Sequence, residues 1–149
     1  MAETELKIHI GKDDLAEVSR ILARLSHSDP EAELLTATYY DTPTLTLFKR
    51  GYTFRVRREG NRPVQTLRLE DPNDRDGLAR GEWTDFLKSD EPDIQKGRSG
   101  RVVRRKFGAP RLKPQLTISV HRYTYVIPYA GDTRIEAAID VGSIRIEGT

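Results

Sequence analysis

Charged side chains recur at every second position in several short segments of this chain, and this pattern limits the possible folds most strongly. Residues 3–10 alternate charged or polar side chains with apolar ones, and residues 52–58 alternate aromatic or aliphatic side chains with polar ones, mainly arginine. A two-residue period is the signature of a β-strand with two different faces. For a single strand, contact of the charged face with solvent is as good an explanation as a functional role. Repetition over several segments predicts a sheet with many charges on one face.

One helix and further strands follow from the rest of the sequence. Asp13 or Asp14 can cap a helix whose apolar residues recur at helical spacing up to Leu25. Residues 45–50 are expected to form a helical turn, and a turn at 60–63 joins two strands as a hairpin. We expect strands at residues 3–10, 34–40, 52–58, 65–70, 78–87, 116–127 and 133–141, with a short segment at 144–147. The prediction is a sheet-dominated α+β domain or barrel of about seven strands, mostly in antiparallel order.

The composition excludes several classes of protein. The 25 Lys and Arg residues nearly balance the 23 Asp and Glu residues, which argues against disorder and against a uniformly basic binder, so nucleic acid is not an expected partner. No apolar run approaches the ~20 residues that cross a bilayer, and the N-terminus lacks a signal-peptide core, so we expect a cytoplasmic protein without a membrane partner. The absence of Cys excludes disulfides, thiolate metal sites and cysteine nucleophiles. Without repeats or linkers, residues 1–149 are expected to form one domain.

Residues 98–113 form the one strongly basic stretch and contain no acid. They are the local candidate for contact with nucleic acid or a membrane surface. Only Phe107 interrupts the basic residues, so the stacking platform of a single-strand binder is absent. We favour the interpretation that this stretch is a solvated or helical segment at the side of the domain. Alternatively, it contributes positive charge to a polyphosphate site.

The opening segment places two carboxylates and an amine on one strand face. Glu3, Glu5 and Lys7 follow one another in steps of two residues, about 6.8 Å apart. Two carboxylates so placed can converge on Mg²⁺ or Mn²⁺, which prefer oxygen ligands, and the lysine can bind a phosphate oxygen beside the metal ion. A solvated strand face explains this short pattern at least as often.

Arginines occur at the same two-residue spacing on another predicted strand. Arg55 and Arg57 share one strand face, and three further arginines lie on separate predicted strands: Arg68, Arg80 and Arg122. The planar guanidinium group donates paired hydrogen bonds to phosphate and stays charged. Several arginines on one face repel one another unless an anionic ligand or interleaved acids neutralise them. The acids available are Glu70, Glu82, Glu136 and Asp140, so a structural ion-pair network is the alternative to a phosphate site.

Several short motifs follow one another in a fixed order. They are Glu3-Thr4-Glu5-Leu6-Lys7, Tyr39-Tyr40-Asp41-Thr42-Pro43 followed by Phe54-Arg55-Val56-Arg57, Thr66-Leu67-Arg68, Gly77-Leu78-Ala79-Arg80-Gly81-Glu82-Trp83, His121-Arg122-Tyr123, and Ile135-Glu136 through Gly142. In this order, from the first residues to about Gly142, the chain resembles the CYTH family, also called triphosphate tunnel metalloenzymes. Phe54 stands where the family usually has Leu, and Arg68 stands where it usually has Lys.

The resemblance implies a fold and a set of residue roles. The family's fold is an eight-stranded antiparallel β-barrel tunnel whose charged lumen binds a triphosphate and a divalent metal ion. It implies Mg²⁺ or Mn²⁺ as cofactor, held by Glu3, Glu5, Glu136 and Asp140. It implies triphosphate binding by Lys7, Arg55, Arg57, Arg68, Arg80 and Arg122. It also implies catalytic roles for Lys7, Arg57 and Glu82, with Glu82 orienting the basic side chains.

The motifs look most like those of bacterial inorganic triphosphatases, which implies metal-dependent hydrolysis of inorganic triphosphate. Class IV adenylate cyclases and thiamine triphosphatases also belong to the family, so both activities are alternatives. Binding of triphosphate or polyphosphate without turnover is a third. Family members close the barrel with a last strand carrying an acidic E-x-E pattern, whereas this chain ends at residues 146–149. We therefore expect either a C-terminally truncated CYTH-like domain or a natural variant whose open edge a second copy completes as a homodimer.

Overall fold

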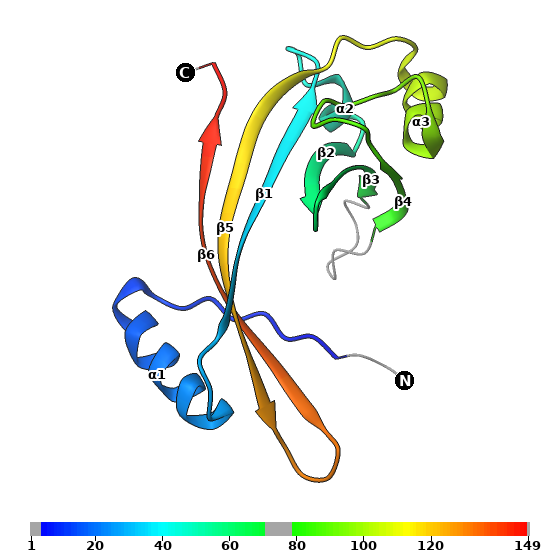
Figure 1. Ribbon diagram of the computed structural model, residues 1–149. Coiled ribbons are helices and arrows are strands. Elements are labelled where there is room, and N and C mark those ends of the chain that lie inside the picture. Colours follow the sequence, from blue (N-terminus) through cyan, green and yellow to red (C-terminus); the bar gives the residue numbers. More distant parts are fainter. Residues whose placement is uncertain (1–3, 71–78, 149) are drawn as a thin grey trace. The chain divides into compact units, whose positions relative to one another are not determined.

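The computed structural model describes residues 4–70 and 79–148 (Figure 1). Strands dominate the described chain. In sequence order the elements are the 3-10 helix η1 (Lys12–Asp14), α1 (Leu15–Ser26), β1 (Glu31–Asp41), α2 (Thr46–Lys49), β2 (Tyr52–Glu59), β3 (Arg62–Glu70), β4 (Ala79–Phe86), α3 (Gly97–Phe107), β5 (Lys113–Pro128) and β6 (Arg134–Ile146). None of the described helices has the length and apolar character that crossing a membrane requires.

The six described strands form one hydrogen-bonded sheet in the order β4-β3-β2-β1-β5-β6. The pairs β1–β2, β2–β3 and β3–β4 are antiparallel. Within the described residues, β4 and β6 are therefore the edges of the sheet, and the sheet does not close on itself. The sheet-dominated α+β prediction is confirmed, and the open sheet agrees with an incomplete barrel.

Internal contacts divide the chain into two compact units. The first unit comprises Met1–Glu33 and His121–Val141, and the second comprises Leu34–Val120 and Gly142–Thr149. Three strands, β1, β5 and β6, contribute residues to both units. The first unit contains α1 and the turn between β5 and β6, and the second contains β2, β3 and β4 with α2 and α3.

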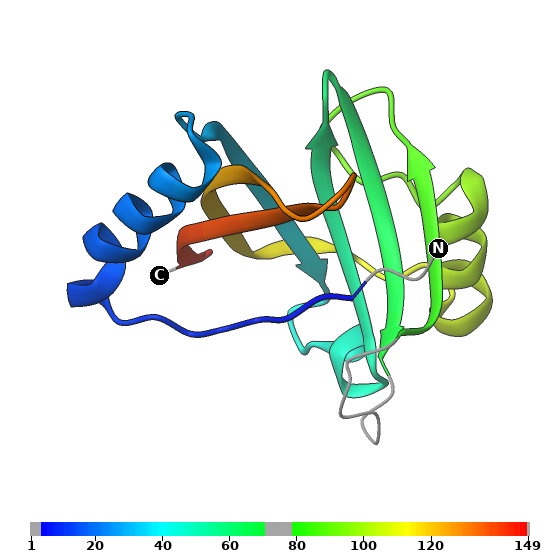
Figure 2. The same cartoon turned by 90° about the horizontal axis from the view of Figure 1, so that it is seen from below.

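The main hydrophobic core lies in the second unit and follows from the alternation in β2. Tyr52, Phe54 and Val56 are 7%, 1% and 6% exposed, and the residues between them belong to the opposite face. Helix α3 lies beside β4 (Figure 2) and contributes the fully buried Val103. The ring of Phe107 meets that of Tyr52 edge to face, with centroids 5.3 Å apart. Burial of each such apolar side chain stabilises the fold by about 1.5–3 kcal/mol.

The strand predicted at residues 3–10 is wrong for its described part. Residues 4–10 form no regular element, and Leu6 and Ile8 are 81% and 74% exposed. Alternation predicts a strand only where one face can be buried, because the apolar side chains supply the stabilising energy. Here they contact too little of the protein to do so.

The strands predicted at residues 133–141 and 144–147 are a single strand, β6. The sequence favours a break at Gly142, because glycine is common in turns. In the structure a Cβ at this position would lie 2.8 Å from the carbonyl oxygen of Ser119 in β5. Gly142 therefore allows a close approach of two backbones within the sheet, which is the other reason for glycine in a strand.

The remaining predicted elements are confirmed within a few residues. The predicted helix corresponds to α1, which Asp14 precedes as N-cap residue without a side-chain capping bond. The helical turn at residues 45–50 corresponds to α2, and the turn at 60–63 joins β2 to β3 as a hairpin. The basic stretch begins in α3, as the helical interpretation predicted.

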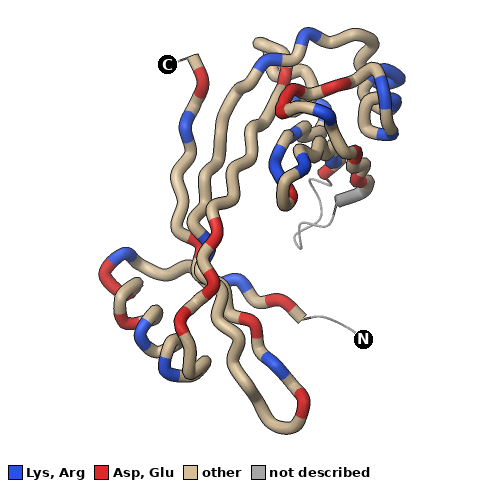
Figure 3. The backbone as a smooth tube through the Cα atoms, in the orientation of Figure 1, with Lys and Arg blue, Asp and Glu red and all other residues tan. Residues whose placement is uncertain are grey.

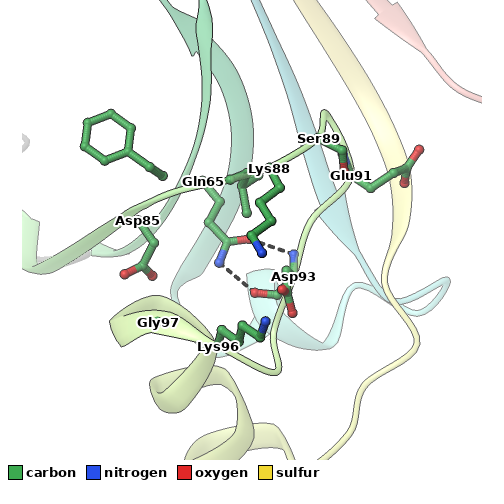
Figure 4. Close-up of a pocket in the computed structure, with 10 residues that line it drawn as sticks. Gln65, Asp85, Lys88, Ser89, Glu91, Asp93, Lys96 and Gly97 are labelled. Carbon is green, nitrogen blue, oxygen red and sulfur yellow. Dashed lines mark hydrogen bonds between the residues drawn. The ribbon is translucent and has the colours of Figure 1, made fainter.

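The N-terminus of α3 is held by a carboxylate from β4 (Figure 4). Asp85 accepts hydrogen bonds from the backbone nitrogens of Arg98 and Ser99, at 2.8 and 2.7 Å, and from the Ser99 hydroxyl. Gly97 has a positive φ of 79°, and a Cβ there would lie 2.5 Å from Asp85 Cγ. Both observations require glycine at the point where the helix meets the strand.

Buried Gln65 of β3 fixes the loop that leads into α3. Its side-chain amide donates to the carbonyl of Asp93 at 2.7 Å and to the Ser99 hydroxyl at 2.9 Å, and its oxygen accepts from the Asp93 amide at 2.9 Å. Gln65 and Asp93, which line the hollow in Figure 4, thus already hydrogen-bond each other, and Asp85 bonds the start of α3. These groups position α3, so we assign them a structural role.

We expect Asp85→Ala to lower the free energy of unfolding by about 2 kcal/mol, because it removes a helix cap and leaves buried donors unpaired. Burial raises the pKa of Asp85, but hydrogen bonds from Ser99 and Arg98 outweigh it, so the pKa lies below its ordinary value. This stabilisation is present above the unfolded-state pKa and is lost as the pH falls through the folded-state pKa. Urea unfolding of both proteins should therefore give a smaller difference at about pH 3 than at pH 7.

Asp132→Ala, at an exposed turn position, is the control for this experiment and should change stability little. An equal difference between wild type and Asp85→Ala at both pH values would contradict the assignment.

Candidate functional site

The strand register brings several predicted residues together on one face of β2, β3 and β4. Arg68 of β3 lies directly opposite Glu82 of β4 and opposite Thr53 of β2. Arg55 and Arg57 follow Thr53 at two-residue intervals and therefore share its face. Directly opposed side chains have Cβ atoms about 5 Å apart. Arg55, Arg57, Arg68 and Glu82 thus form one continuous patch, which we call the arginine face.

Arg55 gives the strongest indication of a ligand. Its Nε atom is buried and has no hydrogen-bond partner among the described residues, and none of them forms an ion pair with its guanidinium group. A buried donor without a partner costs about 1–3 kcal/mol, so such groups are rare in folded proteins. An anion bound on the arginine face would supply the acceptor that Arg55 lacks.

Arg57 and Arg68 each pair with a glutamate two residues farther along the same strand. Arg57 Nη2 lies 2.5 Å from Glu59 Oε1, and Arg68 Nε lies 3.0 Å from Glu70 Oε1. The structural ion-pair network that the sequence left open is therefore partly present. All four side chains are between 37% and 46% exposed, and exposed pairs contribute only about 0–1 kcal/mol. A phosphate can replace either glutamate at little cost.

Hydroxyl groups on the arginine face were missed by the sequence analysis. Thr66 of β3 lies opposite Arg55 and also opposite Thr84 of β4, and the two hydroxyl oxygens are 3.2 Å apart. Tyr39 of β1 lies opposite Arg55 on its other side. Strand parity alone could have placed these residues on a polar face, but their alignment with Arg55 depends on the register, which the sequence did not determine.

In the first unit, Arg122 and Asp140 form a paired contact. Arg122 Nε and Nη2 donate to the two carboxylate oxygens of Asp140 at 2.8 and 2.9 Å. The hydrogen bond from Arg122 outweighs burial and holds the pKa of Asp140 below its ordinary value, and the charge of Lys7 acts in the same direction. Two predicted ligand groups, one for phosphate and one for metal, are thus bound to each other.

The other predicted residues of the first unit are exposed. Lys7 Nζ lies 4.0 Å from Glu5 Oε1, with side chains 87% and 74% exposed, and Glu136 is exposed on β6. Glu3 lies outside the described residues, and so does the side chain of Arg80, although its backbone belongs to β4.

The predicted carboxylates suit a hard divalent cation in chemistry but not in arrangement. Carboxylate oxygens are the ligands that Mg²⁺ and Mn²⁺ prefer. In residues 4–70 and 79–148, however, no three His, Cys, Asp or Glu side chains gather closely enough to hold a metal ion. Both oxygens of Asp140 are engaged by Arg122. The described residues alone therefore do not form a metal centre.

An apolar hollow lies in the second unit near the arginine face. Its volume is about 460 Å³, and its lining includes Tyr39 and Thr53 from that face. Leu116 and Ile118 of β5 and Phe48 of α2 supply apolar side chains. The hollow can accept an uncharged or aromatic group, whereas the arginines can accept phosphate.

Comparison with protein families and solved structures gives matches. The family model described as CYTH domain matches residues 1–147. Among solved structures, the chain is similar to one from Hippeastrum described as a candidate adenylyl cyclase with a dominant triphosphatase activity. The two are 16% identical, with a TM-score of 0.49, over 84% of this chain and 74% of that chain. Comparison with curated proteins gives no match.

Proposed function

The chain belongs to the CYTH domain family, and from that premise we propose that it is a divalent-metal-dependent triphosphatase acting on inorganic triphosphate. The observation that carries the proposal is the buried Nε of Arg55, which lacks an acceptor among the described residues. A substrate with many phosphate oxygens supplies acceptors to Arg55 and to its neighbours on the arginine face together.

The proposed residue roles follow from charge and position. In the second unit, Arg55, Arg57, Arg68 and Arg80 bind phosphate oxygens, and Glu82 orients Arg68, which lies opposite it. In the first unit, Lys7 and Arg122 bind phosphate. Water attacks a terminal phosphorus, the bridging P–O bond breaks, and phosphate and diphosphate leave. Lys7 and Arg57 stabilise the negative charge that develops on the oxygens.

The proposal includes a divalent cation. Glu3, Glu5, Glu136 and Asp140 are the residues that would hold Mg²⁺ or Mn²⁺, and a bound ion would neutralise phosphate charge. Since Asp140 is engaged by Arg122, the roles of the carboxylates need a direct test.

We expect phosphate release from inorganic triphosphate to require added Mg²⁺ or Mn²⁺ and to stop when EDTA is added. Glu5→Gln removes a proposed ligand charge, so it should raise the metal concentration for half-maximal activity about 10- to 100-fold. Titration of each protein with Mn²⁺, followed by phosphate release and by electron paramagnetic resonance of free Mn²⁺, measures this effect.

The matched control is Glu17→Gln, which changes an exposed glutamate on α1 that pairs with Arg20. It should leave the metal requirement unchanged. Full activity of Glu5→Gln without metal, or hydrolysis that EDTA does not affect, would contradict the proposal.

A second candidate function is hydrolysis or cyclisation of an organic triphosphate, and the apolar hollow favours it. The hollow offers room for an uncharged group at Tyr39 and Thr53, which lie opposite Arg55 and Arg68 in the sheet. Assays with ATP and thiamine triphosphate, scored for phosphate and for cyclic AMP, separate this candidate from hydrolysis of inorganic triphosphate. Calorimetric binding without turnover of any substrate would favour a triphosphate-binding module.

A homodimer is also part of the proposal. Among the described strands, β4 and β6 are open edges of the sheet, and an unpaired edge is a template for another strand. A second copy would complete the barrel at one of these edges.

A further inference from the structure

Helix α3 carries a positive surface that the proposed function does not use. Arg98, Arg101 and Arg105 follow one another at helical spacing along one side, and Lys106 lies next to them. All four are exposed, and α3 contains no acidic residue. Figure 3 shows the concentration of Lys and Arg along this helix. We call these four residues the basic face.

The basic face has no acidic partner among the described residues. Within the described chain, none of its four side chains forms an ion pair or a hydrogen bond. Several arginines elsewhere pair with carboxylates: Arg20 with Glu17, Arg57 with Glu59, Arg58 with Asp90, Arg122 with Asp140 and Arg145 with Glu147. The four charges of the basic face are therefore not compensated by ion pairs with the described acids.

Helix stability explains only part of this charge, because Arg105 and Lys106 lie in the last turn of α3 and Arg98 and Arg101 do not. Basic residues are favourable in the last turn of a helix and unfavourable in the first, because of the helix macrodipole. Arg98 lies in the first turn of α3, where the helix contains no acid. Arg104, by contrast, has a structural task, since it donates a hydrogen bond to the carbonyl of Ile94, and we exclude it from the basic face.

We propose that the basic face binds the phosphate backbone of a double-stranded nucleic acid without reading its sequence. Seven residues of helix separate Arg98 from Arg105, about 10 Å. A duplex carries one charge per ~1.7 Å of its axis, so this row faces several phosphates. Guanidinium groups bind phosphate oxygens in pairs. The near-neutral net charge of +2 is an average over the chain and does not describe this surface.

Other polyanions fit the surface less well. A single strand needs exposed aromatic rings for stacking, but the ring of Phe107 is covered by the guanidinium of Arg50 at 4.7 Å and by Tyr52. A helix on a membrane surface inserts apolar side chains. The apolar side of α3 is turned into the protein, where Val103 is fully buried.

The test measures binding to a fluorescein-labelled 20-base-pair DNA duplex by fluorescence anisotropy at salt concentrations from 50 to 200 mM. The variant R98Q/R101Q/R105Q should bind at least 10-fold more weakly than wild type at the lowest salt. Its slope of log affinity against log salt should be smaller by about 2–3, since each phosphate contact contributes about 0.9. The control R20Q/R24Q/R145Q has the same net charge and should bind as wild type does.

Circular dichroism melting shows whether each variant is folded, and R101Q/R105Q serves as a milder variant with an intermediate expected loss. Triphosphate hydrolysis should be unchanged in the basic-face variants. Loss of duplex binding and loss of triphosphatase activity are therefore separate results, and each tests its own proposal. No duplex binding at 50 mM salt, or equal binding by R98Q/R101Q/R105Q and wild type, would overturn the proposal. Tighter binding to vesicles of phosphatidylserine and phosphatidylcholine than to the duplex would overturn it as well.

Discussion

Replacing Arg55 with methionine should leave the free protein about as stable as wild type and remove most of its response to inorganic triphosphate. The buried Nε of Arg55 has no acceptor among the described residues, so the substitution breaks no hydrogen bond at that atom. Methionine keeps a long, flexible side chain to fill the space. The free protein can even gain stability, because an unpaired buried donor is removed.

With substrate the expectation reverses. If Arg55 donates to a phosphate oxygen, its loss removes a charged hydrogen bond from a partly buried site. We expect kcat/KM for inorganic triphosphate to fall by about 100- to 1000-fold, the usual effect of removing one donor to a developing oxyanion. The rise in melting temperature on adding triphosphate should shrink in parallel, since that rise depends on the ratio of ligand concentration to Kd.

Arg58→Met is the matched control. Arg58 follows Arg57 on β2, belongs to the opposite strand face and pairs with Asp90 at 3.0 Å, outside the arginine face. This variant should keep both activity and the thermal response. The ion-pair interpretation of the arginine face predicts the opposite outcome for Arg55→Met: a clear loss of stability in the free protein with an unchanged shift on adding triphosphate.

The sequence predicted the arginine face as a pattern but not as a site. The alternation in residues 52–58 placed Arg55 and Arg57 opposite the core side chains, and β2 confirms it. Two-residue periodicity says which residues share a face and nothing about which strands pair. The alignment of Arg68 with Glu82 therefore depends on the register of β3 and β4, which turn geometry and packing determine.

The predictions from the sequence were wrong in two situations. In one, an alternating segment packs against nothing in the fold; in the other, a residue type has two different structural uses. The alternation at residues 3–10 looks like that of β2, yet Leu6 and Ile8 stay exposed. Burial decides between strand and coil, and burial is a property of the whole fold. The break predicted at Gly142 was wrong for the second reason. Glycine occurs both in turns and where two backbones approach closely, and only the contact with β5 shows that the second applies here.

Asp41 shows that a motif residue can act on the fold instead of on a ligand. It lies at the end of β1 and is 6% exposed. Its Oδ1 accepts from the backbone nitrogens of Thr42 and Leu47, at 2.7 and 2.9 Å, and its Oδ2 accepts from that of Phe48 at 3.0 Å. One carboxylate therefore fixes the chain between β1 and α2 and satisfies amides at the start of that helical turn.

We expect Asp41→Ala to lower the free energy of unfolding by about 3 kcal/mol. The substitution removes three charge-assisted hydrogen bonds and leaves the amide of the fully buried Leu47 without an acceptor. The turn before α2 also contains Leu45 at a φ of 58°, a conformation that costs a non-glycine residue about 1–2 kcal/mol. Without the hydrogen bonds to Asp41, fewer interactions stabilise that strained turn. The loss of unfolding free energy should therefore lie at the upper end of the range for removal of a helix cap.

Asp41→Asn separates this structural role from a role in binding. Asparagine keeps Oδ1 as an acceptor for Thr42 and Leu47 but places an amide where Phe48 N needs an acceptor, so urea unfolding should show about half the loss of Asp41→Ala. Binding of triphosphate, measured by calorimetric titration well below the melting temperature of each variant, should remain close to that of wild type. Equal losses for the two variants would contradict the assignment of separate partners to the two oxygens. A lost triphosphate response in folded Asp41→Asn would place Asp41 in the binding site instead.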